Sequence, residues 1–526
     1  MIEKILVANR GEIAVRIIRT CQEMGIKTAT IYSDVDANSL HVQMADEAAS
    51  CPSVRSYLDM DCIIEIAQKV GAQAIHPGYG FLSENHFFAA KCQEAGLIFI
   101  GPDARAIELM GDKARARETM MAAGVPVTPG SNGIVNSIEE ALEIAGKIGY
   151  PVLVKAVAGG GGRGMRLART PEELTGALEA AKSEANTFFS NADVYLEKFL
   201  EYCRHVEIQI LADHYGQVVY LGERDCSIQR RNQKLIEEAP SPAVSPELRE
   251  RMGKVAVAAA RAVGYSGAGT LEFLLDKYGN FYFMEMNTRI QVEHPVTEFV
   301  CGMDLVKKQI QVASGEPLGY TQSMIKMNGW AIECRINAEN PETFMPSPGE
   351  IEFFRPPGGY GIRLDTAIFN GSVVSPYYDS MVAKLIVYGQ SRMEVIKRML
   401  RALAEFEIEG VDTTLSLHQK ILADPDFQRG KFTTHYIQEK MEQFKNQKIT
   451  KNIAVDEEDN VRDSISPGDL TDSGQIDPEI IAVIAAAVTT YGEAGNSNYR
   501  ITGINPVGKA CLPWRLAGLY DLMGRL

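Results

Sequence analysis

The sequence predicts a multidomain protein of the α/β and α+β classes that begins with a doubly wound parallel sheet. Its 526 residues exceed what one hydrophobic core usually holds, so two to four domains are expected. Over about the first 110 residues, short apolar runs alternate with helical patterns, which is typical of a parallel sheet with helices on both faces. From residue 204 onward strand-like segments dominate, and a further mixed α/β stretch runs to about residue 445.

The predicted parallel sheet consists of apolar runs separated by helical segments. We expect strands at 5–8, 28–32, 74–77 and 97–100, and helices over about 12–24 and 59–69. Gly11 follows the first strand, but the residues around it do not form a G-x-G-x-x-G pattern. A nicotinamide-binding function is therefore poorly supported.

A second unit follows a Gly- and Pro-rich breaker at 124–130, which ends a helix predicted over 112–123. From there to about residue 200 the pattern predicts a compact βαβ-like unit. Its expected parts are a strand at 152–155, a glycine run, a helix over 171–185 and a strand at 194–198.

The composition changes near the end of the chain. Residues 453–479 contain nine Asp or Glu but one Arg, which is typical of a solvated linker. Asp477 and Pro478 then form a helix-start signal, and Gly492 is a stop signal after a short amphipathic helix. This segment is too short to build a core of its own.

Composition and charge exclude several classes of protein. The net charge of −15 argues against nucleic acid as a partner, although local cations can still hold phosphates. The nine cysteines include no C-x-x-C pair, which favours reduced cytosolic thiols over disulfides or zinc. No signal peptide opens the sequence, and the longest apolar run, 480–488, is about half the ~20 residues of a membrane span. We expect a cytoplasmic protein with no membrane span.

A glycine run is the first feature that indicates chemistry. Lys155 ends a predicted strand, and glycines follow at 159–162 and 164. Glycines let backbone N–H groups approach phosphate oxygens closely, although a glycine-rich surface turn is the alternative. No G-K-[ST] follows, so the run is not a Walker A loop.

Two carboxylates and an amide form the second feature. Glu272 lies in one predicted strand, and Glu285 and Asn287 lie in the next. On adjacent antiparallel strands these oxygens can face one Mg²⁺ that also binds nucleotide phosphates. Solvent-facing acids on a hairpin are the alternative, but Lys155 and the glycine run favour the metal.

Alternating polar residues come directly after these acids. Arg289, Gln291 and Glu293 are expected to line the same cleft, where Glu293 can be a general base if no neighbouring cation depresses its pKa too far. His294 is interpreted as a structural histidine. Cations at 230, 231 and 234 favour an anion site, with a surface ion-pair cluster as the alternative.

These four stretches, in this order, resemble the biotin carboxylase family of the ATP-grasp superfamily. The resemblance covers about residues 1–445 and includes blocks at 76–85, 159–165, 224–231, 285–298, 333–339 and 377–381. It implies an N-terminal pre-ATP-grasp domain and an ATP-grasp domain with a mobile lid at about 128–200. The implied boundaries are 1–112, 113–330 and 331–445, the last for a mixed α/β C-terminal domain. Outside the resemblance, composition indicates an acidic linker at 446–476, and we expect a short docking extension at 477–526, with a passive surface-packed extension as the alternative.

The resemblance also implies an activity. ATP and bicarbonate would carboxylate biotin on a separate biotin carboxyl carrier protein, through carboxyphosphate, with Mg²⁺ or Mn²⁺ as cofactor. The AlaMetLysMet carrier signature is absent, so the carrier and the carboxyltransferase are expected on other chains, beside a homodimer of this one. Another ATP-grasp carboxylate–amine ligase and a non-catalytic scaffold homologue are the alternatives. Bicarbonate-dependent ATP hydrolysis that free biotin stimulates would favour the carboxylase.

Site residues follow from the same resemblance, position by position. ATP is expected to contact Lys113, Lys155, Gly160, Gly161, Gly162, Arg163, Glu197, Lys198, Leu200, His205, Gln229, Asn232, Leu274, Glu272 and Glu285. The metal is expected at Glu272, Glu285 and Asn287, bicarbonate at Lys234, Arg289, Gln291 and Val292, and biotin at Tyr79 and Arg335. The residues expected to be catalytic are Glu293, Arg335, Lys234 and Arg289.

Two positions depart from the family's pattern. Asn232 stands where many members have His, so a proton relay there is in doubt, because an amide does not titrate. Ala158 replaces the first glycine of a longer run, which is expected to stiffen the lid slightly.

Overall fold

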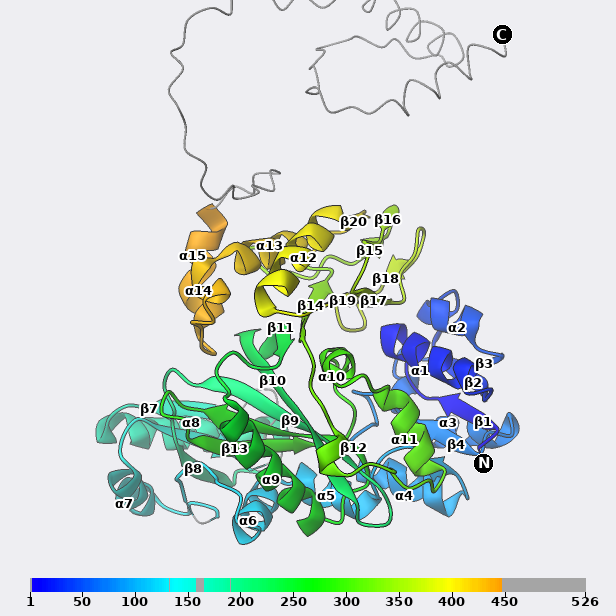
Figure 1. Cartoon of the computed structure of the whole chain (residues 1–526). Helices are drawn as coiled ribbons and strands as arrows, with labels where there is room; N and C mark the ends of the chain where they lie inside the picture. Colours follow the sequence, from blue (N-terminus) through cyan, green and yellow to red (C-terminus); the bar gives the residue numbers. More distant parts are fainter. Residues whose placement is uncertain (1, 132, 158–164, 190, 447–526) are drawn as a thin grey trace, which may run out of the picture. The chain divides into compact units, whose positions relative to one another are not determined.

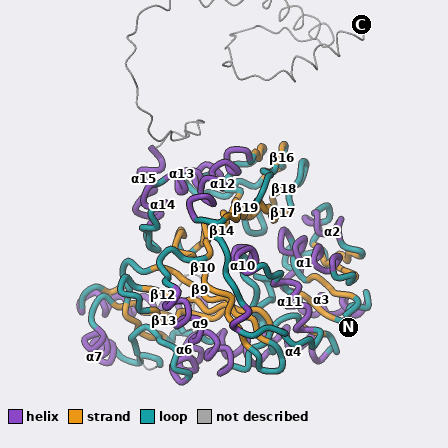
Figure 2. Tube along the Cα trace, in the orientation of Figure 1, coloured by secondary structure: helices purple, strands orange, loops and turns teal. Residues whose placement is uncertain are grey.

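The computed structural model describes residues 2–131, 133–157, 165–189 and 191–446 (Figures 1 and 2). The expected docking extension and the expected acidic linker, apart from its first residue, lie outside the described residues. So do Ala158 and four of the expected ATP contacts, Gly160, Gly161, Gly162 and Arg163.

The chain begins with a five-stranded parallel sheet in the order β3-β2-β1-β4-β5. Its strands are β1 (Lys4–Val7), β2 (Lys27–Tyr32), β3 (Glu47–Ser50), β4 (Ala74–His76) and β5 (Ile98–Phe99). Its helices are α1 (Gly11–Glu23), α2 (Leu40–Met44), α3 (Met60–Lys69), α4 (His86–Glu94) and α5 (Ala104–Gly111), with short 3₁₀ turns η1 (Asp34–Asp36) and η2 (Ser56–Leu58).

Alternate residues of β1 pack against different helices, as the pleat of a strand requires. Ile5 and Val7 belong to the hydrophobic core that contains Ile13 of α1, whereas Leu6 belongs to the core that contains Ile63 of α3. Both faces of the sheet are therefore covered, and the expectation of a doubly wound sheet is confirmed.

The lid region contains a three-stranded sheet in the order β7-β6-β8. Its strands are β6 (Val152–Ala156), β7 (Met165–Ala168) and β8 (Val194–Lys198), and its helices are α7 (Ile138–Ile148) and α8 (Pro171–Phe189). Both β7 and β8 pair antiparallel with β6, so the prediction of a βαβ-like unit is wrong. The missed strand β7 explains the error, because it pairs with β6 before α8 begins; it is short and carries the exposed Arg166.

An eight-stranded antiparallel sheet positions the candidate site, in the order β13-β12-β9-β10-β11-β14-β19-β17. The strands are β9 (Arg204–Ala212), β10 (Val218–Arg230), β11 (Gln233–Ala239), β12 (Gly267–Leu275), β13 (Phe281–Asn287), β14 (Trp330–Asn337), β17 (Ile362–Thr366) and β19 (Met381–Gly389). The helices around it include α6 (Lys113–Ala122), α9 (Pro246–Ala262), α10 (His294–Cys301) and α11 (Leu305–Ala313), and the turn η3 (Gln322–Met324) precedes β14. Because β11 pairs with β14, this sheet continues across the expected boundary at 330.

The last part of the described chain covers β14 and β19 (Figure 1). It comprises α12 (Arg392–Glu405), α13 (Leu415–Ala423), α14 (Pro425–Gln428) and α15 (Tyr436–Asn446), and two small strand pairs, β15 (Gly349–Glu350) with β18 (Val373–Val374) and β16 (Phe353–Arg355) with β20 (Glu407–Glu409). Val395, Met399 and Leu403 of α12 pack against Leu385 and Val387 of β19. Within the described residues, every helix is too short or too polar to cross a membrane.

One expectation about the cysteines is wrong. Cys51, just after β3, and Cys62, in α3, form a disulfide. The fold brings them together although they are 11 residues apart in the chain, a spacing that carries no signal of its own. The other six cysteines in the described ranges are free: Cys21, Cys92, Cys203, Cys226, Cys301 and Cys334.

Candidate active site

A row of charged side chains, the acid row, crosses four neighbouring strands of the large sheet. The register places four residues in line from β10 to β13: Arg224, Glu207, Glu272 and Glu285. Arg224, Glu207 and Glu272 are buried. Because a buried carboxylate is costly unless it is paired, the row requires cations, and the neighbouring residues supply them.

Arg224 is the cation at the β10 end of this row and is fully buried. Its guanidinium donates to Glu207, to Gln209 at 2.7 Å and to Gln291 at 2.9 Å. Further bonds reach hydroxyls of Thr270 and Thr297. The sequence motif included Arg224 but assigned it no role. Arg224 ties the sheet to the loop that precedes α10.

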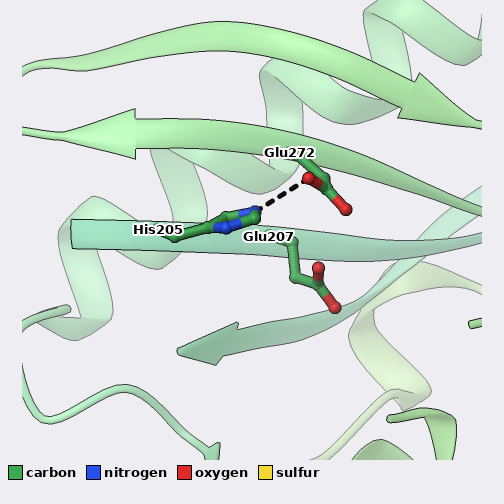
Figure 3. Close-up of side chains that lie close together, drawn as sticks. All are labelled: His205, Glu207 and Glu272. Carbon is green, nitrogen blue, oxygen red and sulfur yellow. Dashed lines mark ion pairs between the residues drawn. The ribbon is translucent and has the colours of Figure 1, made fainter. Parts of the chain in front are cut away.

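Glu272 is the acid on which the polar groups converge. Nε2 of His205 lies 2.8 Å from its Oε2, and both residues lie close to Glu207 (Figure 3). Its Oε1 accepts from Asn287 at 2.8 Å and from Gln291 at 2.7 Å. Burial would raise the pKa of Glu272, but Lys234 and His205 hold it well below its usual range.

Glu285 lies opposite Glu272 on β13 and is more exposed. Its pKa is raised by burial and by the negative charge of Glu272, and Lys113 Nζ at 3.8 Å opposes that shift only in part. A divalent cation between these oxygens would relieve the repulsion. Two carboxylates and the amide of Asn287 are hard oxygen donors of the kind that Mg²⁺ takes, so the residues fit such an ion.

Lys234 lies on β11 and faces three acidic side chains. Its Nζ lies 2.7 Å from Glu207, 3.0 Å from Glu272 and 2.6 Å from Glu293. Burial alone would lower the pKa of Lys234, but the surrounding acidic groups raise it well above its ordinary value. The ammonium is therefore charged, and it is the cationic group of β11.

Glu293 connects Lys234 to Arg335. Besides Lys234, its carboxylate accepts from Nη2 of Arg335 at 2.9 Å. Although burial would raise it, the pKa of Glu293 is lowered by Lys234, Arg335 and Arg224. Neighbouring cations therefore do depress the pKa of the expected general base in the ligand-free chain.

Arg335 has a second acidic partner, Glu237 of β11, which accepts from its Nε at 2.6 Å. Burial raises the pKa of Glu237 to about 7, although Arg335 opposes this. Tyr79 lies near Arg335 as well, and its hydroxyl donates to Glu12. The two residues expected at biotin thus lie near each other beside Glu293.

Besides Lys234, the residues expected to bind bicarbonate lie in the loop between β13 and α10. Arg289 donates to Glu84 at 2.9 Å and to the Asn287 amide oxygen at 3.0 Å. Gln291 lies between Arg224 and Glu272, and the Val292 carbonyl accepts from Lys384 at 2.8 Å. Five of the residues named by the sequence thus contact the acid row directly: Lys113, His205, Lys234, Asn287 and Gln291. Glu293 joins them through Lys234.

The residues expected at the nucleotide form a second group on the lid strands. Nζ of Lys155 lies 2.5 Å from Glu197, and Arg117 backs the same carboxylate at 3.4 Å. Lys198 donates to the carbonyl of Tyr150 at 2.6 Å, so its ammonium is bound to the backbone, and Leu200 follows β8. Leu274 lies opposite His205, and Gln229 lies opposite Lys234, so these residues border the acid row.

Asn232 is not gathered with the rest. It lies at the exposed tip of the β10–β11 hairpin, where Arg231 has φ 48° and Asn232 has φ 66°. A two-residue turn with both φ angles positive is the type I′ turn, in which Asn is strongly favoured. The turn therefore explains this asparagine without a role at the nucleotide.

Sequence reasoning missed Glu207, Arg224 and Glu237. The available signal was charge in strands that are otherwise apolar, such as Glu207 between Val206 and Ile208. Charged residues are rarely buried unless they are paired, so each pointed to a partner across the sheet. The identity of the partner depends on register, which the sequence does not state.

Comparisons with known proteins match almost all of the described chain. Family models match at 1–107 (Biotin carboxylase, N-terminal domain), 112–321 (Carbamoyl-phosphate synthase L chain, ATP binding domain) and 333–439 (Biotin carboxylase C-terminal domain). Biotin carboxylase 1 of Bacillus subtilis is 58% identical over 443 residues, which cover 83% of this chain and 98% of that protein. The 2-oxoglutarate carboxylase small subunit of Hydrogenobacter thermophilus is 54% identical over 442 residues, covering 84% of this chain and 94% of that one.

Solved structures agree. The biotin carboxylase domain dimer of the Hydrogenobacter thermophilus 2-oxoglutarate carboxylase, in complex with MgADP, ADP and bicarbonate, matches with a TM-score of 0.81 and 54% identity, over 84% of this chain and 99% of that one. A Campylobacter jejuni biotin carboxylase complex matches with a TM-score of 0.81 and 46% identity, over the same shares of the two chains. Family models, relatives and solved structures together show that this chain belongs to the biotin carboxylase family.

Proposed function

We propose that this chain carboxylates biotin on a separate carrier protein, using ATP and bicarbonate through carboxyphosphate. A bicarbonate oxygen attacks the γ-phosphorus of ATP, ADP leaves, and carboxyphosphate forms. Carboxyphosphate then breaks its C–O bond to give CO₂ and phosphate, and the ureido nitrogen of biotin attacks CO₂ and loses its proton to phosphate. The observation that carries this proposal is the convergence of Lys234, Glu272 and Glu293 on one buried point.

Lys113 and Lys155 would hold the nucleotide phosphates, and the relative solved with MgADP supports a nucleotide there. Leu200 and Leu274 would line the adenine, with Glu197 and Lys198 at the hinge and Gln229 and His205 beside the nucleotide. Glu272, Glu285 and Asn287 would hold Mg²⁺ or Mn²⁺, which would neutralise charge on the phosphates. The lid at about 128–200 would exclude water from the labile anhydride.

Arg289, Gln291, Val292 and Lys234 would hold bicarbonate, and a relative has been solved bound to bicarbonate. A bound anion would compete with Glu293 for Lys234 and would add negative charge beside it. Both effects raise the pKa of Glu293, because a like charge and the loss of a cation both disfavour the carboxylate. Glu293 would then become basic enough to take the bicarbonate proton.

Arg335 would stabilise the enolate-like oxygen of the biotin ureido ring, with Tyr79 beside the ring. Glu237 and Glu293 hold the guanidinium in place for this task. We further propose that the chain forms a homodimer in the cytoplasm. It would act together with a biotin carboxyl carrier protein and a carboxyltransferase, both on other chains. The docking role of 477–526 rests on the sequence alone.

The direct test measures ADP release from ATP by the purified chain with Mg²⁺, a biotinylated carrier domain and bicarbonate. The proposal predicts ADP release that requires bicarbonate and a matching amount of acid-labile carboxyl group on the carrier. Glu293→Gln is expected to lower the rate by about 10²–10⁴-fold, the usual contribution of a general base, while ADP still binds. Bicarbonate-independent ADP release by the unsubstituted chain, with no carrier carboxylation, would refute the proposal.

A further inference from the structure

Lys384 is a buried cation behind the candidate site. It lies in β19, opposite Arg335 of β14 and Asp365 of β17, and its side chain is fully buried. Its ammonium lies 3.1 Å from Glu12 and 3.9 Å from Asp365. A lysine is almost never fully buried unless it is paired, so these contacts account for its burial.

The third contact of Lys384 is unusual, because it is made to the backbone of the candidate site. Nζ donates to the Val292 carbonyl oxygen at 2.8 Å. That carbonyl and the amide nitrogen of Glu293 belong to the same planar peptide unit, so fixing one end orients the other. The position of the Glu293 backbone is therefore set in part by Lys384.

Two neighbouring carbonyls of the same loop are also held. Nδ1 of His294 donates to the Gln291 carbonyl at 2.7 Å, and Arg289 donates to the Ile290 carbonyl at 3.2 Å. These donors are local, since each is at most three residues away in the chain. Lys384 is the long-range anchor among them, because it ties the loop to a different strand.

Lys384 also reaches the other side of the site. Its partner Glu12 accepts from the hydroxyl of Tyr79, and the ammonium lies 5.9 Å from the centre of the Tyr79 ring. Burial alone would lower the pKa of Lys384, but Glu12, Glu333 and Asp365 raise it, so the ammonium remains charged. One cation thus links the loop of Val292 to the residue beside which biotin is expected.

We propose that Lys384 is a positioning residue that fixes the Val292–Glu293 peptide against Glu12, and so sets where bicarbonate is held relative to Tyr79. This inference rests on the proposed function. Groups that orient catalytic residues from behind typically change affinity or activity by about 10–100-fold when they are removed. The expected defect is a raised KM for bicarbonate rather than for ATP, because the residues expected at the nucleotide lie neither on β19 nor in the loop of Val292.

The test compares Lys384→Met with Arg392→Met in the full chain. Arg392 is a matched control: it is a largely buried arginine that binds the carboxylate of Glu238 and two backbone carbonyls, those of Phe427 and Gln428, away from the site. Lys384→Met is expected to raise the KM for bicarbonate by about 10–100-fold and to leave the KM for ATP within about twofold. Arg392→Met is expected to lower the thermal midpoint without changing either KM by more than about twofold.

A second variant covers the case in which Lys384→Met does not fold. Lys384→Met combined with Glu12→Gln removes both charges, so no unpaired carboxylate from this ion pair remains, and the raised KM for bicarbonate is expected to persist. A normal bicarbonate KM in Lys384→Met or in the double variant would overturn the inference, and so would an equal rise in Arg392→Met. Absence of bicarbonate-dependent ADP release in the unsubstituted chain would instead refute the proposed function itself.

Discussion

Nζ of Lys234 lies 2.6 Å from Oε1 of Glu293, so the proposed anion-binding cation and the proposed base are an ion pair when no ligand is bound. The pair lies between Glu207 and Glu272 on one side and Arg335 on the other. In the proposed reaction, bicarbonate would bind between these groups. Its negative charge would transfer part of the Lys234 interaction from Glu293 to the substrate, which couples substrate binding to the appearance of a competent base.

Removing the cation of this pair tests that coupling. Lys234→Met is expected to slow bicarbonate-dependent ADP release by about 10²–10³-fold, the usual loss when one stabilising donor is deleted. Steady-state kinetics measures the rate, and equilibrium dialysis measures ADP binding, which is expected to persist. Lys254→Met is the control, because Lys254 pairs with Glu250 at the exposed surface of α9. A Lys234→Met rate within about tenfold of the unsubstituted rate would contradict the assignment.

The stability of the chain is expected to depend on pH through Glu237. Its folded pKa is raised to about 7 by burial, whereas the unfolded carboxyl titrates near its ordinary value of about 4.3. Between these values the unfolded state has released the proton and the folded state retains it. Stability from this group is therefore present at low pH and lost as pH rises to about 7, by up to about 1.4 kcal/mol per pH unit.

Glu237→Gln removes that dependence. Urea denaturation at about pH 5 and about pH 7 measures the free energy of unfolding of both proteins. The value for Glu237→Gln minus the value for the unsubstituted chain is expected to increase with pH. A constant difference between the two proteins at both pH values would show that Glu237 is ionised in the folded state across the whole range.

The acid at the centre of the row is expected to govern the requirement for metal. Glu272→Gln removes the charge beside Asn287 and Glu285 and is expected to raise the Mg²⁺ concentration for half-maximal ADP release by about 10–100-fold. Glu223→Gln is the matched control, because Glu223 is a buried acid of the same sheet that is paired with Arg249. Equal Mg²⁺ titrations for the two variants would argue against a metal at Glu272.

Asn232 is expected to matter for the hairpin rather than for catalysis. Asn232→Ala places alanine at φ 66°, and alanine lacks the short polar side chain that helps Asn adopt this left-handed conformation. The substitution is expected to cost about 1–2 kcal/mol of unfolding free energy. Asn232→Gly is expected to retain stability, and both variants are expected to keep the KM for ATP within about twofold. A rise in that KM of about tenfold in the glycine variant would place the side chain at the nucleotide instead.

Local sequence pattern predicted the parts of the fold that have strong local signals. The apolar runs at β1, β2 and β4 are buried strands, as expected. The prediction omitted β3, whose residues are small or polar and mostly exposed at the sheet edge. The strand β7 was missed because it has only four residues and one of them is the exposed Arg166, and without β7 the direction of the lid strands was misjudged.

The candidate site was predictable to the extent that its residues are neighbours along the chain. Glu285 and Asn287 lie on one strand and Arg289, Gln291 and Glu293 follow it, so their proximity follows from the sequence. Arg224 opposes Glu207 only because β9 and β10 adopt one particular register, with a bulge between Tyr220 and Glu223. Long-range partners such as Lys384 and Val292 require the complete fold, and local patterns contain no trace of them.

In the proposed reaction, bicarbonate attacks the γ-phosphorus of ATP and forms carboxyphosphate. The measurement that tests it most directly follows the oxygen atoms: the full chain, a biotinylated carrier, Mg²⁺, ATP and ¹⁸O-labelled bicarbonate are combined, and the phosphate is analysed by mass spectrometry before label exchanges with water. Formation of carboxyphosphate predicts one bicarbonate oxygen in each phosphate released during carboxylation. Carboxylated carrier accompanied by phosphate without label from bicarbonate would contradict the account.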